Sequence, residues 1–378
     1  MDKILLGDLC LPASKNIKLA STDLIDYVDI SSVDNQAKFI TGYTTYEYQD
    51  APSRARKSVS IGDVIISTVR PNLNAVAVFD ITTPNTPVVS TGFCVLSCRD
   101  DVNPRYVYYA CQSREFIRQL VSQATGASYP AVNDKIIRNA LIPNYTLSSQ
   151  NFICDQLDSV QNLINIKKKE NKIFNETIKA RFVEMFGDEK NLMTMSEVCS
   201  IITDGTHQPP RFTDTGIPFI FVSNITGDKV TYDAEKFIDQ DTYDELIKRT
   251  PIEVGDVLLS TVGSYGHPAV VRSDKKFLFQ RHIAYLKPRR EIINSDYLHG
   301  AILSPDAQRQ IEEGVKGIAQ KTLNLSEIKK MRIPVPVMNR QKEFAAFVAQ
   351  VDKSKSVNDR IIDRLQRTKA SLMQEYFG

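Results

Sequence analysis

The sequence has little of what metal sites and most catalytic sites require. None of its four histidines is spaced as a metal ligand, and its six cysteines are scattered along 378 residues. Cys94 and Cys98 form a close pair in CxxxC spacing, without a nearby histidine, which is poor spacing for zinc. We therefore expect no metal in this chain, and we interpret the cysteines as buried free thiols.

An excess of charge of one sign is also missing. The chain has 47 basic and 45 acidic residues, for a formal net charge of +2. Any contact with nucleic acid must then come from local patches or from partner subunits. The sequence contains no run of about eighteen apolar residues, and its first residues lack a signal-peptide pattern. We expect a cytoplasmic protein with no membrane partner.

Known catalytic motifs are absent as well. The sequence contains no GxxxxGK phosphate loop, no HExxH and no strand–GxGxxG–helix cofactor site. The [ND]PP[YF] tetrapeptide of adenine methyltransferases is missing, and QPPR at 208–211 is the nearest match. Asp204, His207 and Ser264 could suggest a triad, but their spacing does not support one, and a polar contact set is favoured. We expect a protein without catalytic activity.

What the sequence does contain is a duplication. GDVIISTV at 62–69 returns as GDVLLSTV at 255–262. Residues 106–187 align without a gap on 297–378, with sixteen identities in 82 pairs. Chance would give roughly five, since two residues of average composition match about 6% of the time. Each half therefore has a preserved frame and a variable interior.

The repeated segments predict the elements of one half. Each GDV phrase is a turn followed by a buried strand, and 75–79 and 267–272 are the returning strands of hairpins. One helix is predicted over 104–123, with Asn103 as its cap, and its counterpart over 295–314. A glycine-containing loop, a short strand ending in proline and a long helix then close each half.

The long helices, predicted over 150–186 and 341–377, carry apolar residues at coiled-coil spacing. One antiparallel register sets Asn171 against Asn358, a polar pair that would fix register and orientation. The alternative is that each helix simply covers its own domain. The predicted seam consists of Leu157, Ile164, Asn171 and Ile178 with Val351, Asn358, Leu365 and Leu372.

The variable loops offer polar side chains of the kinds that contact DNA. Arg, Asn, Gln and Lys bond base edges, whereas Ser, Thr and Tyr commonly bond phosphates. Each residue alone could equally be a solvated loop residue. Arg70 is the strongest single candidate, because it ends the repeated strand phrase. The candidates are Arg54, Arg56, Arg70, Asn72, Asn74, Ser128 and Tyr129, then Thr206, His207, Arg211, Ser264, Tyr265, Gln280, Arg281, Gln320 and Lys321.

Over nearly its full length the chain resembles the specificity (S) subunits of type I restriction–modification systems. The features in common are DGTHQPP at 204–210, the GDV phrase in both halves, and LIPN or IPVP before a long helix. The first half departs from this pattern, because LPASKN stands where the DGTH loop would be. No contact is carried over to that loop.

The resemblance implies an α+β fold in which two tandem, pseudo-twofold-related α/β target recognition domains are separated and joined by two antiparallel coiled-coil helices. The segments would be recognition domains at 1–147 and 189–338, with conserved helices at 148–188 and 339–378. Helices of about 54 Å correspond to some 16 base pairs of duplex, enough for a split site.

The function implied is that of a subunit that reads an asymmetric, bipartite site in double-stranded DNA. It would scaffold two methyltransferase subunits and, through them, restriction subunits. S-adenosylmethionine, ATP and Mg²⁺ are then expected in the partners, with no cofactor in this chain. One alternative is the recognition portion of a fused restriction–methylation enzyme with its own activity. Another is a protein scaffold with no role on DNA.

Overall fold

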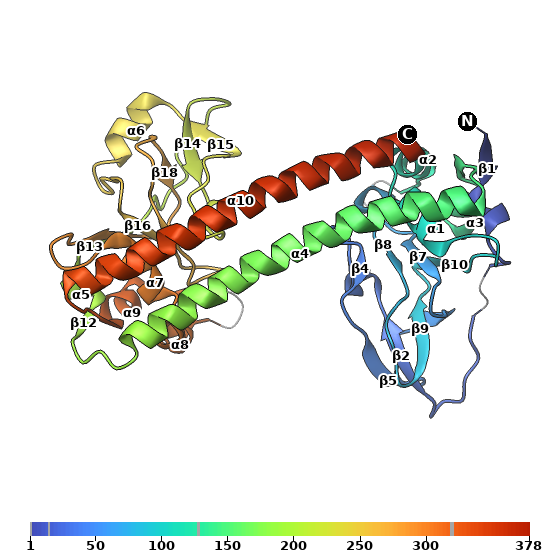
Figure 1. Ribbon diagram of the computed structural model, residues 1–378, viewed down its shortest axis with the longest axis horizontal. Helices are drawn as coiled ribbons and strands as arrows, with labels where there is room; N and C mark the ends of the chain where they lie inside the picture. The colour runs from blue at the N-terminus through green and yellow to red at the C-terminus, as the bar shows by residue number, and fades with distance from the viewer. Residues whose placement is uncertain (1, 14–15, 127–128, 318–320) are drawn as a thin grey trace. The chain divides into compact units, whose positions relative to one another are not determined.

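The computed structural model describes residues 2–13, 16–126, 129–317 and 321–378. The chain forms two compact units, one made of Met1–Lys167 with Ile361–Gly378 and the other of Lys168–Arg360. Both units combine helices and strands, as the predicted α+β class requires (Figure 1). Two long helices, α4 Leu147–Phe186 and α10 Met338–Phe377, each contribute one part to each unit. The predicted division into four segments stays a prediction.

The first unit contains a three-stranded sheet in the order β10-β7-β8 and a four-stranded sheet in the order β5-β2-β9-β6. Short ladders join β1 to β11 and β3 to β4. The strands are β1 Lys3–Leu5, β2 Leu24–Val28, β3 Val33–Asp34, β4 Phe39–Ile40, β5 Thr44–Glu47, β6 Ala55–Ser58, β7 Val64–Ser67, β8 Val76–Val78, β9 Thr86–Ser90, β10 Phe93–Leu96 and β11 Leu141–Pro143. The short helices are α1 Pro104–Ala110, α2 Arg114–Gln123 and α3 Asp134–Arg138.

The second unit repeats this plan with a four-stranded sheet, β13-β19-β16-β17, and a three-stranded sheet, β15-β14-β18. Short ladders join β12 to β22 and β20 to β21. The strands are β12 Leu192–Thr194, β13 Cys199–Asp204, β14 Ile217–Ile220, β15 Lys236–Ile238, β16 Val257–Ser260, β17 Pro268–Val270, β18 Leu278–Phe279, β19 Ile283–Pro288, β20 Val315–Lys316, β21 Thr322–Leu323 and β22 Arg332–Pro334. The short helices are α5 Met195–Val198, α6 Gln240–Leu246, α7 Ser295–Ile302, α8 Pro305–Gly314 and α9 Leu325–Lys330.

The GDV phrase folds as predicted in both units, into a tight turn and a central strand. Gly62 and Gly255 have φ of 94° and 95°, a conformation that glycine adopts without strain. The following Asp63 accepts a 2.8 Å hydrogen bond from the Ser60 amide, and its counterpart Asp256 closes the same turn. Strands β7 and β16 are buried on both faces, which explains their continuous apolar sequence.

The helices predicted over 104–123 and 295–314 are each two helices, so that prediction was wrong. The chain turns at Ser113 and at Ser304, whose side chains cap the next helix by accepting from the amides of Phe116 and Ala307. A serine hydroxyl in this position satisfies a helix amide that has no partner within the helix. The predicted Asn103 cap is confirmed, since its side chain accepts from the Arg105 amide at 2.8 Å.

The duplication extends to individual hydrogen bonds. The buried Tyr106 hydroxyl of α1 donates to the carbonyl of Pro143, at the end of β11. In the second unit the Tyr297 hydroxyl of α7 donates to the carbonyl of Pro334, at the end of β22. In both pairs the two residues are 37 positions apart in sequence, so the two units share this individual hydrogen bond as well as the same elements.

The long helices begin three residues before their predicted starts and run side by side within each unit. The predicted pairing of Asn171 with Asn358 is confirmed by a 3.1 Å hydrogen bond between their side chains. Asn358 is only 5% exposed and also donates to Glu170. Ile178 and Val351 share a core cluster in the second unit, and Leu157 and Leu372 share one in the first. The alternative of two unpaired helices is thereby excluded.

We expect Asn358→Ala to destabilise the second unit by about 1–2 kcal/mol, because it removes the hydrogen bonds that this buried amide donates to Asn171 and Glu170. Denaturant unfolding of the full chain measures this change. Ser354→Ala, at an exposed position of the same helix, is the matched control and should stay within about 0.5 kcal/mol of the original chain. Equal effects of the two substitutions would contradict a structural role for the asparagine pair.

Candidate nucleic-acid interface

In the first unit, three loops meet at one edge of the β10-β7-β8 sheet. The loop after β7 begins at Thr68, whose amide donates to the Gly92 carbonyl at 2.8 Å. The Val132 amide donates to the Thr68 carbonyl at 2.9 Å, which brings the loop around 129–132 to the same edge. The Thr91 amide also donates to the Arg54 carbonyl, so the basic loop before β6 lies beside them.

Arg70 stands at the centre of this edge. Its backbone has φ of 49° and ψ of 62°, the left-handed region, and it precedes a short 3₁₀ turn, Pro71–Leu73. The Arg70 guanidinium lies 4.7 Å from the centre of the Tyr129 ring, in a cation–π contact. Tyr129 is 68% exposed, and Arg54 and Asn72 are exposed as well. We call Arg54, Arg70, Asn72 and Tyr129 the first loop surface.

In the second unit, the corresponding loops meet at the matching edge of the β13-β19-β16-β17 sheet. The Arg281 amide donates to the Thr206 carbonyl at 3.0 Å, which joins the DGTH loop to the segment before β19. The Thr261 amide donates to the His282 carbonyl at 2.9 Å, and the Leu323 amide donates to the Thr261 carbonyl at 2.8 Å. The latter two bonds repeat those that Thr68 makes in the first unit. We call Thr206, His207, Arg211, Ser264, Gln280, Arg281 and Lys321 the second loop surface.

The DGTH loop is held by a residue that the sequence did not reveal. The Asp204 carboxylate lies 2.7 Å from His207 Nε2 and 2.5 Å from an Arg249 guanidinium nitrogen. A cavity of about 590 Å³ lies between this loop and the segment from Thr242 to Thr250. Asp204 therefore fixes the orientation of both His207 and Arg249. Arg249 follows α6 at a distance of 45 residues from Asp204, and no motif in the sequence joins the two.

Some candidate residues are used inside the fold. Asn74 is 6% exposed; its side chain donates to the Cys111 carbonyl and accepts from Lys38. The Arg56 guanidinium donates to the Ala55 carbonyl and lies over the Tyr48 ring. We leave Asn74 and Arg56 out of the first loop surface for this reason.

Tyr265 is likewise engaged within its own unit. Its ring packs against the core, and its hydroxyl donates to Glu312 at 2.9 Å. Lys321 lies 6.0 Å from the centre of the ring, so the two candidates are neighbours. We leave Tyr265 out of the second loop surface. Ser128 and Gln320 lie outside the described residues.

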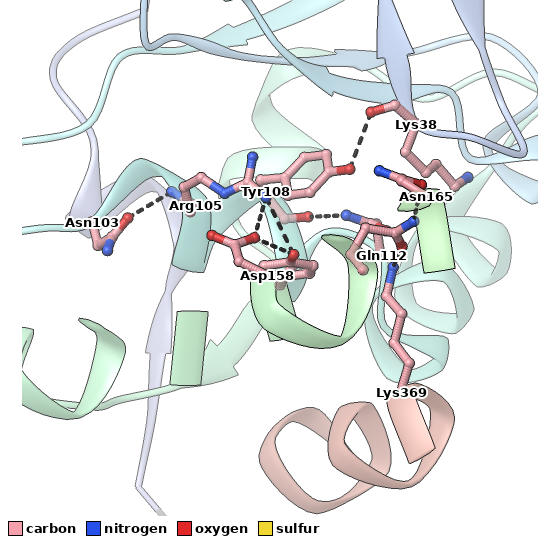
Figure 2. A network of polar contacts seen from close by, with 10 residues as sticks. Lys38, Asn103, Arg105, Tyr108, Gln112, Asp158, Asn165 and Lys369 are labelled. Atoms are coloured by element: carbon pink, nitrogen blue, oxygen red, sulfur yellow. Dashed lines mark hydrogen bonds and ion pairs between the residues drawn. The ribbon is translucent and has the colours of Figure 1, made fainter. Parts of the chain in front are cut away.

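A polar network anchors the first unit's loops to the helix pair (Figure 2). Asp158 of α4 accepts from Arg105 and from the Tyr109 hydroxyl, both on α1. The Tyr108 hydroxyl donates to the Lys38 carbonyl at 3.1 Å. Burial lowers the pKa of the Lys38 ammonium to about 8, and this ammonium bonds the Asn74 side chain. The loop that carries Arg70 is thus braced by α1, which is itself held by α4.

Two further features of the described residues bear on function. They contain no cluster of three histidine, cysteine or carboxylate side chains that could hold a metal ion. The helices in the described part of the chain include none that is long and apolar enough to cross a membrane.

Comparison with known proteins finds a similarity to type I restriction modification specificity proteins. Residues 188–367 match the family model described as the type I restriction modification DNA specificity domain. The chain is 24% identical over 291 residues to the type I restriction enzyme EcoBI specificity subunit of Escherichia coli, covering 68% of this chain and 61% of that protein. It is 20% identical over 298 residues to the MjaVIII specificity subunit of Methanocaldococcus jannaschii, covering 71% and 68%.

The fold agrees with that of a chain in a solved structure from a study of complex assembly and conformational transition in the type I R-M system. The TM-score is 0.57 at 24% identity, over 99% of this chain and 97% of that chain. The chain spans about three fifths of the length of its Escherichia coli relative. The second part of the chain is thus similar to a type I restriction modification DNA specificity domain, and about two thirds of the chain is similar to type I specificity subunits.

Proposed function

We propose that this chain is the DNA sequence-specificity subunit of a type I restriction–modification complex. The first loop surface reads one part of a split site, and the second loop surface reads the other part. The observation that carries this proposal is the pair of matching sheet edges, where the same backbone bonds hold loops of different sequence. A preserved frame with different loops predicts an asymmetric, bipartite target.

The residues on both surfaces suit DNA. Exposed Arg54, Arg70 and Asn72 in the first unit can bond base edges or phosphates. In the second unit, exposed Arg211 and Arg281 can also bond base edges or phosphates. Both belong to the second loop surface, in which Asp204 orients His207. The net charge near zero fits a chain whose partners supply much of the phosphate contact.

The partners proposed are two methyltransferase subunits and, through them, restriction subunits. S-adenosylmethionine, ATP and Mg²⁺ belong to those subunits, and this chain supplies sequence recognition without catalysis of its own. The proposed location is the cytoplasm, where chromosomal DNA is reached.

Methylome sequencing of cells with and without the gene tests the proposal. We expect one bipartite adenine-methylation motif to disappear when the gene is deleted and to return with a plasmid copy. The purified chain should neither methylate nor cleave DNA until methyltransferase subunits and S-adenosylmethionine are added. Methylation or cleavage by the chain alone, or an unchanged methylome in the deletion strain, would overturn the proposal.

A further inference from the structure

Cys10 and Cys98 face each other across a bridge between neighbouring strand segments of the first unit. The flanking hydrogen bonds run from the Leu11 amide to the Ser97 carbonyl at 2.8 Å and from the Arg99 amide to the Leu9 carbonyl at 3.1 Å. This pattern makes the cysteines a non-hydrogen-bonded pair, whose Cα atoms are typically about 4.5 Å apart. Disulfides span Cα separations of about 4.4–6.8 Å, so these thiols could be joined with little movement of the backbone.

The surroundings of the two thiols differ from those of an inert buried pair. A hydrogen bond from the Cys98 thiol, aided by the Arg138 guanidinium, lowers the pKa of Cys10 in spite of its burial. The same hydrogen bond and burial raise the pKa of Cys98. Arg138 donates from one guanidinium nitrogen to the Leu11 carbonyl at 2.6 Å, while its buried Nη1 has no hydrogen-bond partner among the described residues. The Arg138 guanidinium therefore favours the Cys10 thiolate, as cations do at reactive cysteines, and the Asp63 carboxylate opposes it more weakly.

We propose that Cys10 and Cys98 form a redox-reactive pair, which closes to a disulfide when a hydroperoxide oxidises the chain. The Cys10 thiolate attacks the peroxide, breaks its O–O bond and becomes a sulfenic acid, and the other oxygen leaves as an alcohol after taking a proton. Cys98 then loses its proton and attacks the Cys10 sulfur, and the sulfenic hydroxyl leaves as water. The two thiols give two electrons to the peroxide, so the products are one disulfide, one alcohol and one water.

The duplication supplies an internal control for this pair. Cys199 occupies the position of Cys10 at the start of the second unit, but its partner across the sheet is Pro288. Burial raises the pKa of the Cys199 thiol to about 12, and those of Cys94 and Cys154 to the same value. These cysteines should stay reduced under conditions that oxidise the pair. In a reducing compartment the disulfide is transient, forming with the oxidant and reversed by thiols.

The test exposes the folded full-length chain to hydrogen peroxide, then unfolds it, alkylates free thiols and maps peptides by mass spectrometry without reduction. We expect a peptide linked through Cys10 and Cys98, a paired loss of their alkylation, and full alkylation of the other cysteines. A reductant should restore both thiols. The oxidised chain should also unfold at a higher temperature, because the link closes the loop from residue 10 to residue 98.

Single substitutions separate the two steps. In Cys98→Ser, Cys10 should accumulate as a sulfenic acid that dimedone traps, while in Cys10→Ser, Cys98 should stay alkylatable. Cys154→Ala should leave the linked peptide unchanged. The proposal is overturned if Cys10 and Cys98 keep their alkylation in the folded chain at a peroxide dose that oxidises the unfolded chain, or if the linked peptide joins other cysteines.

Discussion

Replacement of Phe344 by alanine is expected to destabilise the second unit by about 3–5 kcal/mol. Phe344 of α10 is fully buried, and its ring centre lies 5.3 Å from that of Phe182 and 6.1 Å from that of Tyr297. These rings, with Phe186, join α4, α7 and α10 in one aromatic cluster. Removing the ring leaves a cavity among α4, α7 and α10 of the second unit, and close-packed surroundings relax only partly to fill such a cavity.

Denaturant unfolding of the full chain, followed by hydrogen exchange of the α7 amides, measures the loss in the second unit. Phe152→Ala is the control, because Phe152 lies on α4 with 57% of its surface exposed. Its effect should stay within about 0.5 kcal/mol. Comparable losses in the two variants would mean that the aromatic cluster does not hold the junction together.

A second substitution sharpens this test. A Cβ atom on Gly300 would lie 2.5 Å from the Phe344 ring, so Gly300→Ala should destabilise the original chain by overpacking. In a Phe344→Ala background the same methyl group enters the new cavity. We expect the double variant to lose less stability than the sum of the two single variants, by about 1 kcal/mol or more. Additive losses would show that the two positions do not share one packed space.

The sequence predicted the elements that the two units share, because these elements come from sequence patterns that occur in both halves. The GDV turns and their strands follow from glycine and continuous apolar residues, and the helix seam follows from apolar spacing that places Asn171 opposite Asn358. The break of each helix at Ser113 and Ser304 was missed, because the capping serines, the second of which is followed by Pro305, were not recognised as helix starts.

The candidate site was predictable only in part, because the loop side chains contact residues that are far away in the sequence. Arg70 and Tyr129 were both selected, yet only the fold shows that the tyrosine ring supports the guanidinium. Asn74 is of a residue type that commonly contacts DNA. Its side-chain amide instead donates to the Cys111 carbonyl, which lies at the end of α1, later in the chain. Arg249 was missed because its partner Asp204 is brought to it by the sheet.

Replacement of Arg70 by alanine is expected to weaken binding to one half of the proposed split site by about 1–3 kcal/mol, or roughly five- to 150-fold. The Arg70 guanidinium is exposed at the edge of the first sheet and is oriented by the Tyr129 ring, so little side-chain freedom is lost on contact with a guanine edge. Arg281→Ala should give the matching loss at the other half. Competition binding by the complex reconstituted with methyltransferase subunits, with each half of the site changed in turn, measures both effects.

The charge-preserving variant Arg70→Lys decides whether Arg70 reads bases or contacts phosphates. A lysine keeps the charge but cannot make the paired bonds that arginine makes to guanine, so it should stay impaired on the correct sequence. Arg99→Ala is the control, since Arg99 is an exposed arginine paired with Asp101 beyond the opposite end of β10. A loss in Arg70→Ala that is equal on all sequences, with a shallower salt dependence and full rescue by lysine, would instead identify Arg70 as a phosphate contact. Sequence reading in the first unit would then have to come from Asn72 and Arg54, the other polar side chains exposed at the same edge.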